Sequence, residues 1–83
     1  MTRLETITIT AMDYADELFG NELINIIDNK DYNFFMDIIR KVQLRMTEDG
    51  KITNNDIDNY FLDVLDAVKE GVIIATNFAQ LKK

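Results

Sequence analysis

The chain contains no cysteine, histidine, serine, proline or tryptophan. Without cysteine there is no disulfide, no thiolate nucleophile and no zinc–thiolate site. Without histidine the chain lacks the commonest general base at neutral pH and the commonest ligand of transition metals. The absence of serine also excludes serine-based catalytic triads. The sequence therefore predicts a protein that is not an enzyme and that uses no cofactor and no metal ion.

Glycine is scarce, and long apolar runs are missing. Gly20, Gly50 and Gly71 are the three glycines in 83 residues, so the chain has no glycine-rich loop of the kind that holds phosphate groups. No apolar run approaches the roughly 18 residues that a membrane-spanning helix needs. The N-terminus has no basic region followed by an apolar block. We therefore expect one cytoplasmic domain, without a signal peptide and without a membrane partner.

Basic residues are outnumbered: nine Lys and Arg face fifteen Asp and Glu, a net charge of −6. Direct binding of nucleic acid requires a concentrated basic patch. The basic cluster of Arg40, Lys41 and Arg45 is small. It follows Asp37, which stands in the favourable orientation for ion pairs within a helix. We expect no direct contact with nucleic acid, and the acidic surface favours either a basic protein partner or solubility alone.

The first ten residues alternate in a way that is typical of a strand. Threonines flank Ile7 and Ile9, which gives the period of two of a half-buried strand, and β-branched residues favour that conformation. We therefore predict an extended arm or a short strand over residues 1–10, followed by a single helical domain over residues 11–83. A strand needs a pairing partner for its backbone, and the alternative is an extended arm that frays.

Apolar residues recur at helical spacing through most of the remaining chain. Gly20 and Asn21 interrupt the first stretch, so either one helix runs through them or two short helices meet there. We predict that Asp31 caps a following helix, that residues 47–51 form a turn, and that Thr53 caps the last helix. The predicted fold is mainly α: a small bundle of three or four helices with a short extended or β N-terminal arm.

The segment around Asp49 and Gly50 resembles the second half of an EF-hand calcium loop. A functional loop supplies oxygen ligands at its first and third positions and a bidentate glutamate at its end. Counted back from Gly50, the first position is Arg45, and the last position is Asp56. A cation in place of the first carboxylate argues against calcium, so we predict a plain connection between two helices.

The last predicted helix has an acidic edge. At about 100° per residue, several carboxylates share one narrow arc that no basic residue interrupts. The residues of this acidic edge are Asp56, Asp63, Asp66 and Glu70. A second acidic group, formed by Asp13, Asp16 and Glu17, stands on the first predicted helix. We take both groups as candidate sites for binding a partner.

Three interpretations of the acidic edge remain open. It docks onto a basic patch of another protein, or it is a solvated helix face, or it imitates the regular charge of nucleic acid. Small acidic proteins of phages and mobile elements use such mimicry as inhibitors of restriction or CRISPR systems. The favoured function is a non-catalytic acidic protein-binding module, of which an inhibitor of a nucleic-acid-processing protein is one form. The mimic hypothesis gains if the two acidic groups are adjacent in the fold.

The same helix turns apolar after Gly71. Its end is apolar most of the way round, unlike a surface helix. The candidate apolar interface comprises Val72, Ile73, Ile74, Phe78 and Leu81. This segment lies in a dimer or partner interface, or beneath the N-terminal arm, or in a strand over residues 72–78 that pairs with the arm. We favour a helical interface, so the alternative function is a structural homodimer or assembly subunit.

Overall fold

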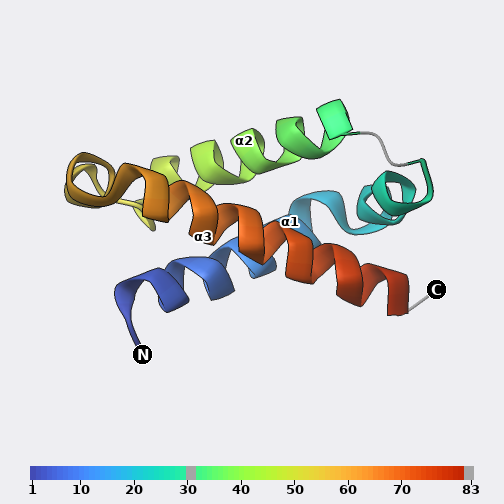
Figure 1. Ribbon diagram of the computed structural model, residues 1–83, viewed down its shortest axis with the longest axis horizontal. Coiled ribbons are helices and arrows are strands. Elements are labelled where there is room, and N and C mark those ends of the chain that lie inside the picture. Colours follow the sequence, from blue (N-terminus) through green and yellow to red (C-terminus); the bar gives the residue numbers. More distant parts are fainter. Residues whose placement is uncertain (30–31, 82–83) are drawn as a thin grey trace.

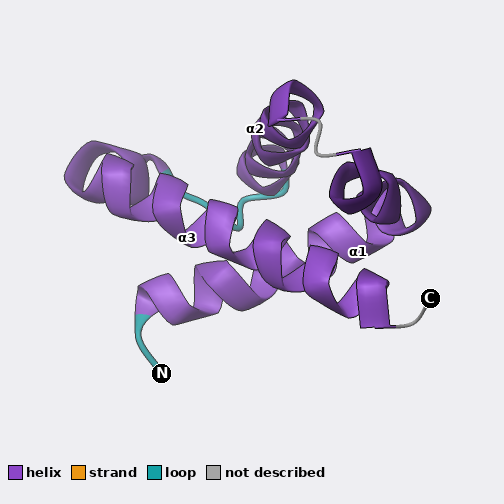
Figure 2. Ribbon diagram, turned by 45° about the vertical axis from the view of Figure 1, so that its right-hand side comes forward, coloured by secondary structure: helices purple, strands orange, loops and turns teal. Residues whose placement is uncertain are grey.

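Three α-helices make up most of the computed structural model, which describes residues 1–29 and 32–81 except the side chains of residues 26–29 (Figure 1). They are α1 (Arg3–Asn29), α2 (Tyr32–Glu48) and α3 (Asn54–Leu81). No strand occurs among the described residues (Figure 2). The prediction of a mainly helical protein is therefore confirmed, whereas the predicted cap Asp31 lies outside the described residues.

The prediction of an extended arm or strand over residues 1–10 is wrong, because α1 begins at Arg3. A capping box starts this helix. The amide of Glu5 donates to Oγ1 of Thr2 at 3.1 Å, and the amide of Thr2 donates to Oε1 of Glu5 at 3.4 Å. This reciprocal pair satisfies two of the backbone amides that a helix start leaves without partners.

The alternation of threonine and isoleucine is accommodated by the helix. The hydroxyls of the three alternating threonines each donate to the carbonyl oxygen four residues earlier, at 2.8–3.1 Å. Ile7 is buried, whereas Ile9 is 43% exposed. Burial then recurs at Ala11 and Ala15, which is the spacing of a helix and not of a strand. Packing of this face in the core thus overrides the local preference of β-branched residues for a strand.

The helices α1 and α3 each contain one kink. In α1 the residue before Gly20, Phe19, has non-helical angles (φ −133°, ψ 18°), so two helical segments meet in one bent helix. In α3 the kink lies at Tyr60 (φ −141°, ψ 39°), where the sequence predicted none. Beyond it α3 runs through Gly71 to Leu81, so the favoured helical conformation of residues 72–78 is confirmed.

The helices α1 and α3 lie side by side and run in the same direction, with α2 packed against both (Figure 1; Figure 2). Their starts meet where Arg3 pairs with Asp56, and their middles meet where Gly71 faces Ala11. All three helices contribute to one apolar core. Its largest buried side chains are those of Ile7, Leu23, Ile38, Ile39, Val42, Met46, Ile52, Val64, Val68 and Val72.

Gly71 allows a very close approach of α1 and α3. A Cβ atom at this position would lie 2.5 Å from the carbonyl oxygen of Thr8, 2.7 Å from Cβ of Ala11 and 2.9 Å from the amide nitrogen of Met12. Glycine inside a helix is less favourable than alanine by about 1 kcal/mol. Contact between the two helices therefore explains why α3 contains glycine here.

Candidate protein-binding groove

Asp56 holds the start of α3 in place and does not belong to an exposed edge. Arg3 donates to its carboxylate from Nε at 3.2 Å and from Nη2 at 2.8 Å. The amide and the hydroxyl of Thr53 also donate to Oδ2 of Asp56, at 2.8 and 3.0 Å. In return, Oγ1 of Thr53 accepts from the amide of Asp56 at 3.2 Å, which completes a second capping box and confirms the predicted Thr53 cap.

These contacts lower the pKa of the Asp56 carboxyl. The hydrogen bonds from Arg3, and then that from the amide of Thr53, hold the pKa of the Asp56 carboxyl well below its usual range. The residue is only 9% exposed. The assignment of Asp56 to a partner-binding edge is therefore corrected, because its carboxylate already accepts hydrogen bonds from Arg3 and Thr53.

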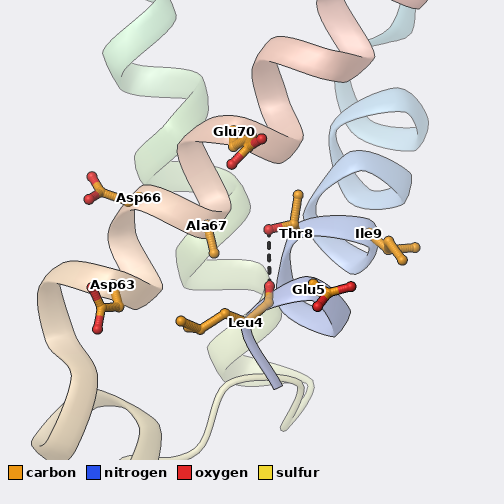
Figure 3. A pocket seen from close by; sticks show the side chains of 8 residues that line it. All are labelled: Leu4, Glu5, Thr8, Ile9, Asp63, Asp66, Ala67 and Glu70. Atoms are coloured by element: carbon orange, nitrogen blue, oxygen red, sulfur yellow. Dashed lines mark hydrogen bonds between the residues drawn. The ribbon is translucent and has the colours of Figure 1, made fainter. Parts of the chain in front are cut away.

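The other carboxylates of the acidic edge line an open groove of about 430 Å³ between α1 and α3 (Figure 3). Figure 3 shows Asp63 and Asp66 on the α3 side and Glu70 farther along the same helix. Glu5 and Ile9 stand on the α1 side, and the middle of the groove is formed by Leu4, Thr8 and Ala67. The groove thus has a mainly apolar floor with carboxylates on both sides, of which that of Asp66 points away from α1 and lies at the outer border (Figure 3).

The carboxylates of the groove have no cationic partner within the described ranges of the chain. The ion pairs found there join Arg3 to Asp56 and Arg40 to Asp37, outside the groove. The hydroxyl of Thr8 donates to the carbonyl of Leu4 at 3.0 Å, so this polar group at the floor of the groove already has a hydrogen-bond partner within α1 (Figure 3). Four like charges around one concave surface produce a local negative potential.

The second acidic group does not line this groove. Asp13, Asp16 and Glu17 are all exposed on α1. Asp16 and Glu17 instead border a hollow around the kink of α1. The structure therefore brings Asp63, Asp66 and Glu70 together with Glu5, which sequence reasoning missed.

The candidate apolar interface divides between core and surface. Val72 is fully buried, so its assignment to a partner interface is corrected, and Ile74 is half-buried. Ile73, Phe78 and Leu81 remain exposed. The explanation that placed this segment beneath an extended N-terminal arm is wrong, because α1 begins at Arg3; the neighbouring Gly71 packs against this helix instead.

A further apolar surface lies at the kink of α3, where the sequence analysis predicted none. Tyr60, Phe61 and Leu62 are consecutive and all more than half exposed. Non-helical angles at Tyr60 turn this part of α3 away from the direction of the rest of the helix. These residues form a surface distinct from the groove, although Leu62 and Asp63 are neighbours in sequence.

Comparisons with protein-family models, with curated proteins and with solved structures gave no match for this chain. In the part of the chain that the structure describes, no helix combines the length and apolarity needed to cross a membrane. The same part contains no group of three acidic, histidine or cysteine side chains close enough to hold a metal ion.

Proposed function

We propose that this chain is a non-catalytic acidic module that binds a basic surface of a partner protein through the α1–α3 groove. The observation that carries the proposal is the set of groove carboxylates, Glu5, Asp63, Asp66 and Glu70, which have no ion pair with a described residue. Like charges three and four residues apart on a helix destabilise it. A basic partner relieves this repulsion on binding, and complementary charge also raises the rate of association.

In one form of this proposal, the basic surface of the partner is its nucleic-acid-binding site. Such surfaces bind phosphates largely through charge, so an array of carboxylates competes for the same lysines and arginines. The chain then acts as an inhibitor by imitating nucleic acid. This form predicts that the chain and an oligonucleotide exclude each other from the partner, which a competition measurement by fluorescence anisotropy tests.

The proposed function is tested by charge reversal in the groove with a matched control. Wild-type chain, Asp63→Lys/Asp66→Lys and Asp13→Lys/Asp16→Lys are immobilised, and the proteins retained from a lysate are compared by mass spectrometry over a salt series. We expect one set of basic proteins to be kept by wild type and by the Asp13/Asp16 control, and lost with the groove variant and at high salt. Retention of the same set by the groove variant would contradict the proposal.

A second candidate function is self-association through the end of α3. Phe78 is 52% exposed and Leu81 80% exposed, which is unusual for large apolar side chains on one helix end. Ile73 adds to this surface. Sedimentation equilibrium at high micromolar concentration distinguishes the two functions. A dimer that Phe78→Asp abolishes supports the structural role, and a strict monomer removes it.

A further inference from the structure

We infer that the α1–α3 groove binds a basic amphipathic helix of the partner protein. This inference rests on the proposed function and names the element of the partner that enters the groove. The apolar face of that helix covers Leu4, Ile9 and Ala67, and lysines or arginines at the borders of the face reach the carboxylates on both sides.

The floor of the groove selects for an apolar side chain. Ala67 is the groove residue of α3 without a charge, and it is 6% exposed, so most of the apolar surface that the groove offers to a partner comes from α1. Leu4 is half-buried beside Ala67, and Ile9 on the α1 side is 43% exposed. A partner that supplied only positive charge would leave this apolar surface in contact with water. An aliphatic side chain packed against Leu4 and Ile9 removes this surface from water.

The spacing of the charges suits a helix. Asp63, Asp66 and Glu70 stand at positions i, i+3 and i+7 of α3. With a rise of about 1.5 Å per residue, they extend over about 10 Å, or two helical turns. A helix laid alongside has the same rise, so basic residues at its own i, i+3 or i+4, and i+7 positions meet these carboxylates in register. Glu5 receives a basic residue from the opposite border of the same face.

The hydrogen bonds available to the backbone of the occupant favour a helix over an extended peptide. Extended peptides bind where a sheet edge offers free amides and carbonyls. Both walls of this groove are helices, whose backbone groups in the middle of each helix are already paired. The hydroxyl of Thr8 also donates within α1. An extended peptide would therefore gain no backbone hydrogen bonds from the walls, whereas a helix brings its own backbone hydrogen bonds.

Three synthetic probes test this inference against wild type and four variants. The first probe is a labelled peptide of about 18 residues, long enough to form a helix, with leucines on one face and lysines and arginines bordering it. The second has the same composition in an order that removes the apolar face. The third has the first pattern with glutamates in place of the basic residues. Binding is measured by fluorescence anisotropy to wild type, to Asp63→Asn/Asp66→Asn/Glu70→Gln and to Asp13→Asn/Asp16→Asn/Glu17→Gln.

The two triple variants lose the same number of charges and the same residue types, so they differ only in location. We expect the amphipathic basic peptide to bind wild type at least about tenfold more tightly than the reordered peptide. The groove variant should weaken that binding by about tenfold, as expected for three exposed ion pairs, and the control variant by less than about threefold. The acidic peptide should not bind.

A third comparison isolates the floor. Ile9→Asn should weaken binding of the amphipathic peptide and leave the reordered peptide unchanged, whereas Leu18→Asn, a similarly exposed position on α1 outside the groove, should change neither. Circular dichroism of each variant verifies its fold. If the two basic peptides bind wild type equally and both bind the groove variant more weakly, the inference of a helical occupant is overturned while the proposed function stands. Equal weakening in both triple variants overturns both. Self-association that only the groove variant disrupts identifies a second copy as the occupant and also overturns the inference.

Discussion

The contact between α1 and α3 is closed in two regions and open in a third. At the helix starts, Asp56 is buried and held by Arg3 and Thr53. At Gly71 the two backbones nearly touch. Between these regions the groove exposes carboxylates that have no ion pair with a described residue, Asp63 among them. Two aspartates seven residues apart on one helix thus have different roles, and what differs is whether a cation faces them across the helix contact.

The largest expected effect is on the closed contact at Gly71. Gly71→Val places a branched side chain against the backbone of α1 and should destabilise the protein by about 3 kcal/mol, because the helices must separate. Gly20→Ala is the control, since nothing lies within 4 Å of a Cβ there. It should stabilise the protein by up to about 1 kcal/mol. Urea unfolding measures the free energy of unfolding of both variants. A Gly71→Val variant as stable as wild type would contradict the close contact between α1 and α3 at this position.

The next effect distinguishes the two aspartates. Asp56→Ala removes the capping box of α3 and the ion pair with Arg3, so we expect a loss of about 2 kcal/mol in the free energy of unfolding. Asp63→Ala removes an exposed carboxylate that has no ion pair with a described residue, and should change stability by less than about 0.5 kcal/mol. The same unfolding measurement compares them. Equal losses for the two variants would remove the distinction between closed and open regions.

Stability should also depend on pH through Asp56. Because the pKa of Asp56 is lowered in the folded state, the unfolded state binds the proton more readily, so stability falls as the pH decreases through about 4. We expect the difference between wild type and Asp56→Asn, about 1 kcal/mol or more at pH 7, to narrow as the pH falls below about 4 and to persist in part at pH 2, because the lowered pKa keeps the folded-state carboxyl partly ionised there. Unfolding curves of both proteins between pH 7 and pH 2 measure this. A constant difference would show that the ionised carboxylate is not what stabilises the helix start.

The smallest effect concerns the groove itself. Neutralising Asp63, Asp66 and Glu70 with their amides should leave stability unchanged or raise it by a few tenths of a kcal/mol, since repulsion is relieved and no contact is lost. The gain should diminish with added salt. Thermal unfolding at low and high salt provides the measurement. A marked loss of stability would mean that these carboxylates hold the fold together and are not available to a partner.

The sequence predicts the helical class, the Thr53 cap and the helical end of the chain because each depends on local spacing. It fails over residues 1–10, where alternation and a capping box support different structures. Thr2 and Glu5 stand at the spacing of that box, and Glu5 is also the groove residue that was missed. The local signal for both was therefore present in the sequence.

The groove could be predicted only in part. Helical periodicity places Asp63, Asp66 and Glu70 on one side of α3, and it places Asp56 there as well. That Asp56 meets Arg3 across the fold, 53 residues earlier in the chain, depends on the packing of α1 against α3. Periodicity within one helix contains no information on such contacts between helices, so the distinction between the two aspartates required the structure.

The most direct test of the central claim is to map the binding site residue by residue. Amide chemical shifts of the ¹⁵N-labelled chain are recorded during titration with the basic amphipathic peptide. We expect the largest changes along the groove, at Glu5, Thr8, Ala67 and Glu70, and small changes at Asp13, Asp16 and Glu17. Largest changes at the exposed apolar residues, either Tyr60, Phe61 and Leu62 or Phe78 and Leu81, would contradict the assignment of the groove as the binding site.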